Sequence, residues 1–256
     1  MNAPEILIDI NSDLGESPQT LADGSDLELM RFITSANVAC GAHAGSESTM
    51  RETLKAAREL KIAVGAHPSF PDRANFGRVL MPLSAADIEA TVREQIVSLT
   101  AVADTLGMRI THVKPHGALY HAARERRVAE AIGRAAASVD PQLLMIGQAG
   151  SSTLEHWRAM GLRCAGEAFA DRVYQKDGGL RSRSLAGALL DMPGRAAAQA
   201  QEIVMRHRAI TTDGDELQIH AETLCIHSDT PNAASIAREV KHQLTAAGVT
   251  VRSLVR

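Results

Sequence analysis

Seven short apolar runs, rich in β-branched residues, alternate with longer amphipathic segments along this chain. The runs occupy residues 5–11, 34–40, 61–67, 109–115, 142–147, 163–170 and 222–227. Strands and helices in repeated alternation are typical of parallel strands that are joined by helical crossovers. Because one α/β barrel commonly takes roughly 200 to 250 residues, the pattern predicts a single α/β domain over residues 1–256, a (β/α) barrel of about seven parallel strands.

Capping residues indicate where several of the intervening helices begin and end. Ser84 and Asp87 have the spacing of a capping box at the start of the longest predicted helix, and Gly107 ends it. The other helices are predicted over 47–60, over 122–137, from Ser152, and after Thr230 with Pro231 as the first helical residue.

One segment, residues 171–221, interrupts the alternation of strands and helices. It contains a charged loop, a helix near 194–207 and the pair Asp213 and Gly214, which suits a tight hairpin turn. We therefore expect an inserted loop, helix and hairpin over one end of the barrel.

Polar residues fall on one face of each predicted strand. Side chains two residues apart share a face, and the polar sets are Asp9, Asn11 and Asp13; Asn37 and His43; His67; His112, Lys114 and His116; Glu167 and Asp171; His227 and Asp229. The outer faces of barrel strands meet apolar helix stripes, where unpaired charges are costly. We therefore expect the polar faces to point into the barrel, near the carboxyl ends of the strands, where barrel active sites are built.

Histidines and a carboxylate from separate strand ends offer ligands for a metal ion. Asp13, His43, His67 and His116 carry the oxygen and nitrogen donors that zinc or another divalent ion prefers. The same residues are candidates for proton transfer without a metal, and a lone histidine is more often a satisfied core or loop residue. The pattern leaves these alternatives open.

Positive charges at two places are candidates for binding an anion. Lys114 either holds a phosphate or carboxylate or pairs with an inward-facing Asp or Glu. Arg172 and Tyr174 lie in the inserted loop, which either clamps a substrate or lies in solvent. Glycine-rich turns at 40–48 and 147–153 precede helices and can receive a phosphate, although neither has the GxxxxGK[ST] pattern.

The charge balance and the cysteines exclude several classes of protein. A net charge of −3 without a long basic run argues against binding to nucleic acid or to an anionic membrane. The chain lacks a basic signal-peptide start and a run of about 18 apolar residues that could span a membrane. Cys40, Cys164 and Cys225 are far apart, which favours buried thiols over disulfides. We expect a cytoplasmic protein with a small-molecule partner.

Several longer motifs together resemble the LamB/YcsF family. They are DINSDLGE (9–16), ACGAHAG (39–45), GAHPSFPD (65–72), HVKPHGALY (112–120), EAFADRVY (167–174) and CIHSD (225–229). The resemblance implies a barrel of the glycoside hydrolase/deacetylase type and a bacterial 5-oxoprolinase activity, which opens 5-oxo-L-proline to L-glutamate with hydrolysis of ATP. It also implies Mg²⁺ or another divalent metal brought with ATP, and two further 5-oxoprolinase subunits, B and C, as partners.

The family motifs imply functional residues at the matching positions. We assign catalysis to Asp13, Glu16, His43, His67, Lys114 and His116. We assign substrate binding to Asp171, Arg172, Tyr174, His227 and Asp229 and, from the inward faces of their strands, to Asn11 and Asn37. The expected ligands of any metal are Asp13, His43 and His67. Ala42 and Ser46 depart from the family pattern, which leaves the substrate open.

The implied chemistry is phosphorylation of the lactam carbonyl oxygen by ATP, followed by ring opening. Lys114 is then expected to bind phosphate charge, and His116 or His67 to move protons, while Asp13 with Glu16 orients a base or Mg²⁺. Two alternatives are a stand-alone metal-dependent deacetylase or amidohydrolase and a non-catalytic subunit that binds 5-oxoproline.

Overall fold

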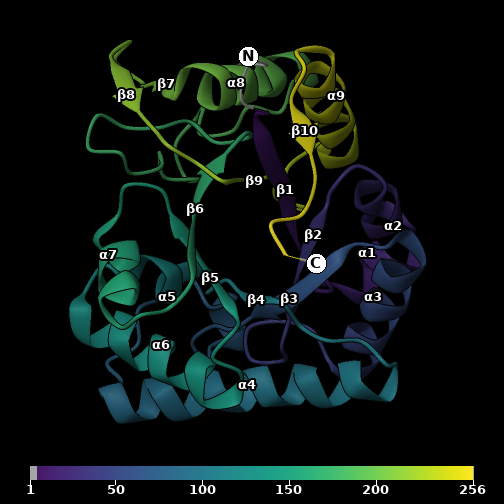
Figure 1. Ribbon diagram of the computed structural model, residues 1–256, viewed down its shortest axis with the longest axis vertical. Helices are drawn as coiled ribbons and strands as arrows, with labels where there is room; N and C mark the ends of the chain where they lie inside the picture. Colours follow the sequence, from purple (N-terminus) through teal and green to yellow (C-terminus); the bar gives the residue numbers. More distant parts are fainter. Residues whose placement is uncertain (1–4, 256) are drawn as a thin grey trace.

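The computed structural model describes residues 5–255, and a closed ring of parallel strands forms its centre (Figure 1). The strands of the ring are β1 (Leu7–Leu14), β2 (Ser35–Ala39), β3 (Ala63–His67), β4 (His112–Val113), β5 (Leu144–Gln148), β6 (Cys164–Phe169) and β9 (Thr223–Cys225). The sheet has eight strands in the order β10-β1-β2-β3-β4-β5-β6-β9, and direct pairing of β1 with β9 closes all of them except β10 into a barrel. The predicted barrel of seven parallel strands is confirmed.

Helices surround the barrel and cover its outer face (Figure 1). They are α1 (Pro18–Ala22), α2 (Ser25–Met30), α3 (Glu47–Leu60), α4 (Ala85–Thr105), α5 (Gly117–Ala122), α6 (Arg126–Val139), α7 (Ser152–Ala159), α8 (Pro193–Arg206) and α9 (Ala233–Ala246), with a 3₁₀ turn, η1 (Arg73–Asn75). α4 packs beside α6, and α8 packs beside α9. Within residues 5–255, no helix has the length and apolar character needed to cross a lipid bilayer.

Several predicted helix ends are confirmed. The segment over 47–60 is α3, and the predicted helix near 194–207 is α8. The Ser84 hydroxyl accepts a hydrogen bond from the backbone N–H of Asp87 and so caps α4, while Gly107 follows the helix with a positive φ of 65°. A side-chain oxygen at this N-terminus satisfies one of the helix's otherwise unpaired N–H groups.

Two predicted helix starts are wrong by a few residues. The segment 122–137 is divided, because α5 ends at Ala122 and α6 begins at Arg126. By contrast, α7 begins at Ser152 as predicted, with Ser151 in the cap position. Thr230 does not cap α9, because its hydroxyl donates a hydrogen bond to Asp171; the helix begins only at Ala233.

The segment 171–221 contains the predicted hairpin. β7 (Arg208–Ile210) and β8 (Glu216–Gln218) pair antiparallel, and Gly214 between them has a positive φ of 85°. Outside this segment, β10 (Thr250–Val251) adds a short parallel pairing to the first residues of β1, which the sequence did not indicate.

A polar network fills the barrel where side chains of different strands meet. The Asn11 amide nitrogen donates to Glu167 and Thr223 across the interior. The Asn37 amide donates to Asn11, and His112 Nε2 lies 3.0 Å from Asn37 Oδ1. These contacts join β1, β2, β4, β6 and β9, so the prediction that the polar faces point inward is confirmed. Each of these buried polar groups finds a partner there, which offsets its loss of water.

The interior leaves no room for a side chain at Gly65 of β3. A Cβ atom built there would lie 2.2 Å from Cδ2 of His112. We expect Gly65→Ala to displace the His112 ring and to lower the free energy of unfolding by about 1–3 kcal/mol, the usual range for overpacking.

Urea denaturation of the Gly65→Ala variant measures this effect. Gly194→Ala in α8 is the matched control, because a Cβ at Gly194 meets nothing within 4 Å and a helical Gly→Ala change stabilises by about 0.4–1 kcal/mol. Equal midpoints for the Gly65→Ala variant and the unmodified chain would show that the interior tolerates the methyl group.

Candidate active site

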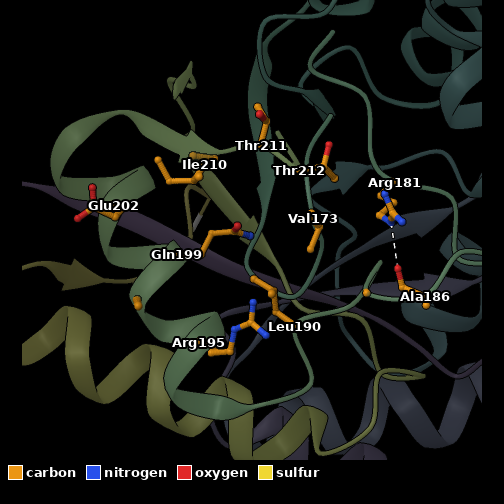
Figure 2. A pocket seen from close by; sticks show the side chains of 13 residues that line it. Val173, Arg181, Ala186, Leu190, Arg195, Gln199, Glu202, Ile210, Thr211 and Thr212 are labelled. Carbon is orange, nitrogen blue, oxygen red and sulfur yellow. Dashed lines mark hydrogen bonds between the residues drawn. The ribbon is translucent and has the colours of Figure 1, made fainter. Parts of the chain in front are cut away.

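Two cavities are present at the inserted segment, and only one of them contains the polar strand ends. The larger, of about 620 Å³, lies between the inserted loop, α8 and β7, and its lining includes Leu190, Arg195, Gln199 and Glu202 (Figure 2). The smaller, of about 300 Å³, is lined by the carboxyl ends of the barrel strands and by the arginines of the inserted loop. A cavity with convergent titratable groups is the better candidate for an active site.

Lys114 forms the charged floor of the smaller cavity together with two carboxylates. Its Nζ lies 2.9 Å from Asp13 Oδ1 and 2.8 Å from Glu167 Oε1, and it also donates to Asn11 and to the Cys225 sulfur. Burial opposes the charged form, yet the neighbouring Asp13 and Glu167 carboxylates hold the pKa of Lys114 well above its usual range. Of the two alternatives for Lys114, the structure shows pairing with inward-facing acidic residues.

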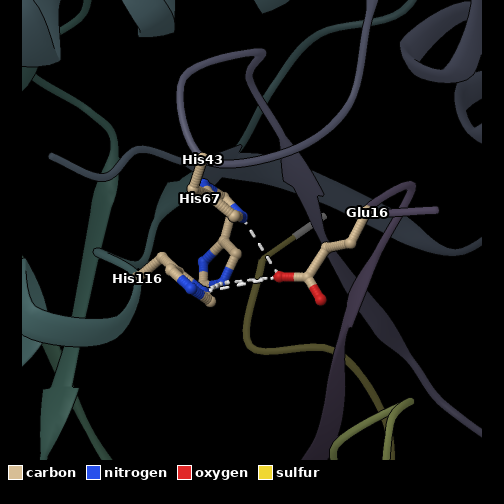
Figure 3. Close-up of side chains that lie close together, drawn as sticks. All are labelled: Glu16, His43, His67 and His116. Atoms are coloured by element: carbon tan, nitrogen blue, oxygen red, sulfur yellow. Dashed lines mark hydrogen bonds and ion pairs between the residues drawn. The ribbon is translucent and has the colours of Figure 1, made fainter. Parts of the chain in front are cut away.

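Three histidines and a carboxylate meet beside this floor; we call Glu16, His43, His67 and His116 the histidine cluster (Figure 3). Glu16 Oε1 lies 3.1 Å from His43 Nε2, 3.4 Å from His116 Nδ1 and 3.9 Å from His67 Nε2. His67 Nε2 and His116 Nδ1 are 3.0 Å apart. The rings of His43 and His116 stack with their centroids 3.9 Å apart.

Each ring of the histidine cluster also has an outer nitrogen that is bound to a protein oxygen. His67 Nδ1 lies 2.7 Å from the Lys114 carbonyl, and His116 Nε2 lies 2.9 Å from the Phe76 carbonyl. His43 Nδ1 lies 2.9 Å from the hydroxyl of Ser69, which itself donates to the carbonyl of Phe70. Because carbonyl oxygens only accept, and the Ser69 proton is already donated, all three outer nitrogens carry the hydrogen. The inner nitrogens then point toward Glu16.

Burial and the charge of Asp13 shift the pKa values of the residues in the histidine cluster. Desolvation lowers the pKa of His43 to about 3 and that of His116 to about 2. Burial, with the nearby Asp13 charge, raises the pKa of Glu16 to about 7. Burial alone would lower the pKa of His67, but the Asp13 carboxylate, whose Oδ2 lies 3.3 Å from Nε2, raises it. At neutral pH two of the three imidazoles are therefore uncharged.

Several arginines also line the cavity. Arg172 is 7% exposed, its Nη2 donates to the carbonyl of Arg181, and its Nε has no hydrogen-bond partner within residues 5–255. At the rim, Asp229 accepts hydrogen bonds from Arg78, at 2.9 Å, and from Arg183, at 2.5 Å. Arg172 therefore places a cation at the lining of the cavity, while its unpaired Nε is buried.

His227 lies at the cavity with its orientation fixed by Asp171. Its Nδ1 lies 3.0 Å from Asp171 Oδ1, and its ring stacks on Phe169. Thr230 also donates to Asp171, which is completely buried. Because Asp171 engages Nδ1, the ring nitrogen available to a substrate is Nε2.

The predicted site residues do not all reach the cavity. Asp13, His67, Lys114, His116, Arg172 and His227 line it. Asn11 and Asn37 lie below it in the barrel network, Asp171 lies behind His227, and Asp229 pairs with the rim arginines. Tyr174 lies apart from the cavity lining, and its hydroxyl accepts a hydrogen bond from the backbone of Phe169.

Other residues of the site were not among the predicted ones. Glu167 lies on the face of its strand that was expected to point into the barrel, and Arg183 lies in the charged inserted loop. The sequence therefore carried a signal for both residues. Arg78, which shares Asp229 with Arg183, carried no such signal. For Ser69, the only signal in the sequence was its position two residues after His67. Its contact with His43 depends on how two loops meet.

Residues 8–256 match the model of the LamB/YcsF family. The chain belongs to the LamB/YcsF family. Its relatives include the A subunit of 5-oxoprolinase from Chloroflexus aggregans, which is 47% identical over 96% of this chain and 98% of the relative. The protein of the same name from Methylococcus capsulatus is 44% identical over 96% of this chain and 95% of the relative.

A solved structure with a comparable sequence identity to this chain has the same fold. The lactam utilization protein of Thermus thermophilus superposes with a TM-score of 0.89 at 42% sequence identity, covering 97% of this chain and 100% of the other. The LamB/YcsF match extends over the strands, the inserted segment and the last helix, so every part of the cavity lies within the region shared with the family.

Proposed function

We propose that this chain is the A subunit of an ATP-dependent 5-oxoprolinase, which opens 5-oxo-L-proline to L-glutamate. The observation that carries the proposal is the identity of 42–47% to proteins of that name over nearly the whole chain. The B and C subunits of 5-oxoprolinase are the proposed partners, and ATP is the proposed co-substrate.

The cavity supports a small anionic lactam as the substrate. 5-Oxoproline carries one carboxylate and one cyclic amide, and a volume of about 300 Å³ is at the lower end of the range for small-molecule sites. The carboxylate suits the wall that holds Arg172, because guanidinium groups bind carboxylates through paired N–H donors. The amide ring then extends toward the wall formed by His67 and His116.

The ring opening needs two molecules of water and one of ATP. The lactam carbonyl oxygen takes the γ-phosphoryl group and ADP leaves; water then adds to the carbonyl carbon, and the carbon–nitrogen bond breaks with a proton delivered to the nitrogen. The product is an acyl phosphate of glutamate, which a second water hydrolyses to glutamate and phosphate. Phosphorylation makes a stabilised amide susceptible to attack.

His227 suits proton transfer better than His67 or His116. Its Nδ1 is held by Asp171 and its Nε2 is available at the cavity, which is the arrangement of a histidine base that is oriented by a carboxylate. His67 and His116 instead turn their inner nitrogens toward each other and toward Glu16. Lys114 acts indirectly, by keeping the Asp13 carboxylate charged beneath the lactam.

Glutamate release from 5-oxoproline and ATP tests the proposal. The chain alone and the chain reconstituted with its B and C partner subunits are compared, with ATP omitted as the control. We expect ATP-dependent glutamate only in the reconstituted mixture. Absence of glutamate from both would contradict the proposal, and glutamate formed without ATP would favour a stand-alone amidohydrolase.

A further inference from the structure

In the histidine cluster, one nitrogen of each of the three imidazole rings and one oxygen of Glu16 face one another, and each of these atoms can accept a hydrogen bond. The outer nitrogens of its rings donate to the Ser69 hydroxyl and to the carbonyls of Lys114 and Phe76. In the neutral tautomers that these contacts fix, each inner nitrogen has a lone pair that faces the other rings and the Glu16 carboxylate, although His67 Nε2 can also hold a proton beside Asp13. Four acceptors this close together need either a proton on one of them or a metal cation among them.

The spacing of these atoms matches that of ligands around a metal ion. With bonds of about 2.0–2.1 Å, two ligands of a zinc ion lie about 3.0–3.4 Å apart at angles between octahedral and tetrahedral. Three separations fit this range: 3.0 Å for His67 and His116, 3.1 Å for His43 and Glu16, and 3.4 Å for His116 and Glu16. His67 and Glu16 are 3.9 Å apart, and all four ligand atoms lie within 4.8 Å of one another. The separations between these donor atoms are therefore close to those expected around a bound zinc ion.

We propose that the histidine cluster binds one divalent transition-metal ion with the ligand preference of zinc. Three imidazoles and one carboxylate favour Zn²⁺, Co²⁺ or Fe²⁺ over Mg²⁺, which prefers oxygen ligands and keeps its water. The outer hydrogen bonds hold each ring in the tautomer and orientation that a metal ligand needs. Gln95 extends this support, because its side chain bonds both the N–H and the carbonyl of Ser69.

The proposed ligands differ from Asp13, His43 and His67, the set expected from the sequence. Asp13 Oδ1 already accepts hydrogen bonds from Asn37 and Lys114. A second group of donor atoms, formed by Asp13, Cys225 and His227, is less suited to a cation. The Lys114 ammonium lies 3.1 Å from the Cys225 sulfur, so a metal ion there would meet a positive charge at close range.

An ion in the histidine cluster would lie at the wall of the cavity, since His67 and His116 line both. Such an ion supplies a Lewis acid for a carbonyl oxygen or for water. Its part in lactam opening rests on the proposed function, whereas its binding does not. The two proposals therefore fail separately.

Metal binding to the purified full chain tests the inference without substrate or partner proteins. The chain is stripped with a chelator and titrated with Zn²⁺ in competition with a chromophoric chelator, and with Co²⁺ while its visible absorption is recorded. We expect one ion per chain, a Co²⁺ spectrum without thiolate charge-transfer bands, and no displacement by millimolar Mg²⁺. A stripped chain that binds neither ion would overturn the proposal, and thiolate bands would overturn it by placing the ion at Cys225 instead.

Three substitutions locate the ion. His116→Ala removes a ligand, and we expect the Zn²⁺ affinity to fall more than 100-fold. Ser69→Ala removes only the partner of His43 Nδ1, and a loss of about 10–100-fold is expected, the usual effect of deleting such a support. His121→Ala is the matched control, because His121 also lines the cavity but lies outside the histidine cluster.

Circular dichroism shows whether each variant is folded. Zn²⁺ affinity in the His116→Ala variant equal to that of the unmodified chain would overturn the assignment of the ligands. An equal loss in the His121→Ala variant would do the same, since it would place the ion elsewhere in the cavity.

Discussion

Replacement of Lys114 by methionine is expected to lower the free energy of unfolding by about 3–5 kcal/mol, the range measured when one member of a buried ion pair is removed. Methionine has a similar length, so the change leaves little empty space. It removes the only cation within hydrogen-bond distance of Asp13 Oδ1 and Glu167 Oε1 in residues 5–255, and both carboxylates are buried. Glu167 then has no cationic partner among these residues, and Asp13 keeps only His67.

The variant also has a predicted pH dependence. His67 and Lys114 overcome the effect of burial and hold the pKa of Asp13 well below its ordinary range, so the stability that this group contributes is present above its unfolded pKa of about 3.9 and is lost as the pH falls through the folded value. Without Lys114, Asp13 takes up a proton more readily. We therefore expect the difference between the variant and the unmodified chain to be largest near neutral pH and to shrink in acid.

Urea denaturation at several pH values measures both effects, and Lys176→Met is the matched control. Lys176 pairs with Asp215 at the surface, where the two side chains are 75% and 50% exposed. Exposed pairs of this kind contribute about 0–1 kcal/mol. If Lys114→Met cost no more than Lys176→Met, the charged floor of the cavity would not be a stabilising ion pair.

The barrel and the direction of its polar residues could be predicted because both follow from strand geometry. Alternation along a strand placed Asn11, Asn37 and Glu167 on one face, and the closed sheet brings them into contact. Short strands did not weaken this inference: β4 has only two residues, His112 and Val113, yet they face opposite sides as the parity requires.

The partners within the site could not be predicted in the same way, because loops decide them. Glu16 replaces Asp13 as the carboxylate nearest to His43, since the chain turns at Gly15, with a positive φ of 71°, directly after β1. The outer partner of His116 is the carbonyl of Phe76, which belongs to a turn forty residues earlier. Such contacts depend on loop conformation, for which the sequence has no simple period.

Replacement of Arg172 by alanine is expected to raise the KM for 5-oxoproline by about 10–100-fold in the reconstituted enzyme, with a smaller change in kcat. Hydrogen bonds to charged groups contribute about 1.5–3 kcal/mol, which corresponds to that range. Arg172 lines the cavity, and in the described part of the chain its guanidinium forms no ion pair with a carboxylate. A substrate carboxylate would provide one. Steady-state kinetics of glutamate release measure the change.

The matched control for this variant is Arg195→Ala, because Arg195 lines the larger cavity instead (Figure 2). Its removal should leave KM within about two-fold of the original value, since no contact with the substrate is lost. Arg172→Lys separates charge from geometry: lysine keeps the charge but lacks the planar pair of donors, so we expect only partial recovery. An increase of KM in the Arg195→Ala variant, with none in the Arg172→Ala variant, would place 5-oxoproline in the cavity beside α8 and leave the polar strand ends with another ligand.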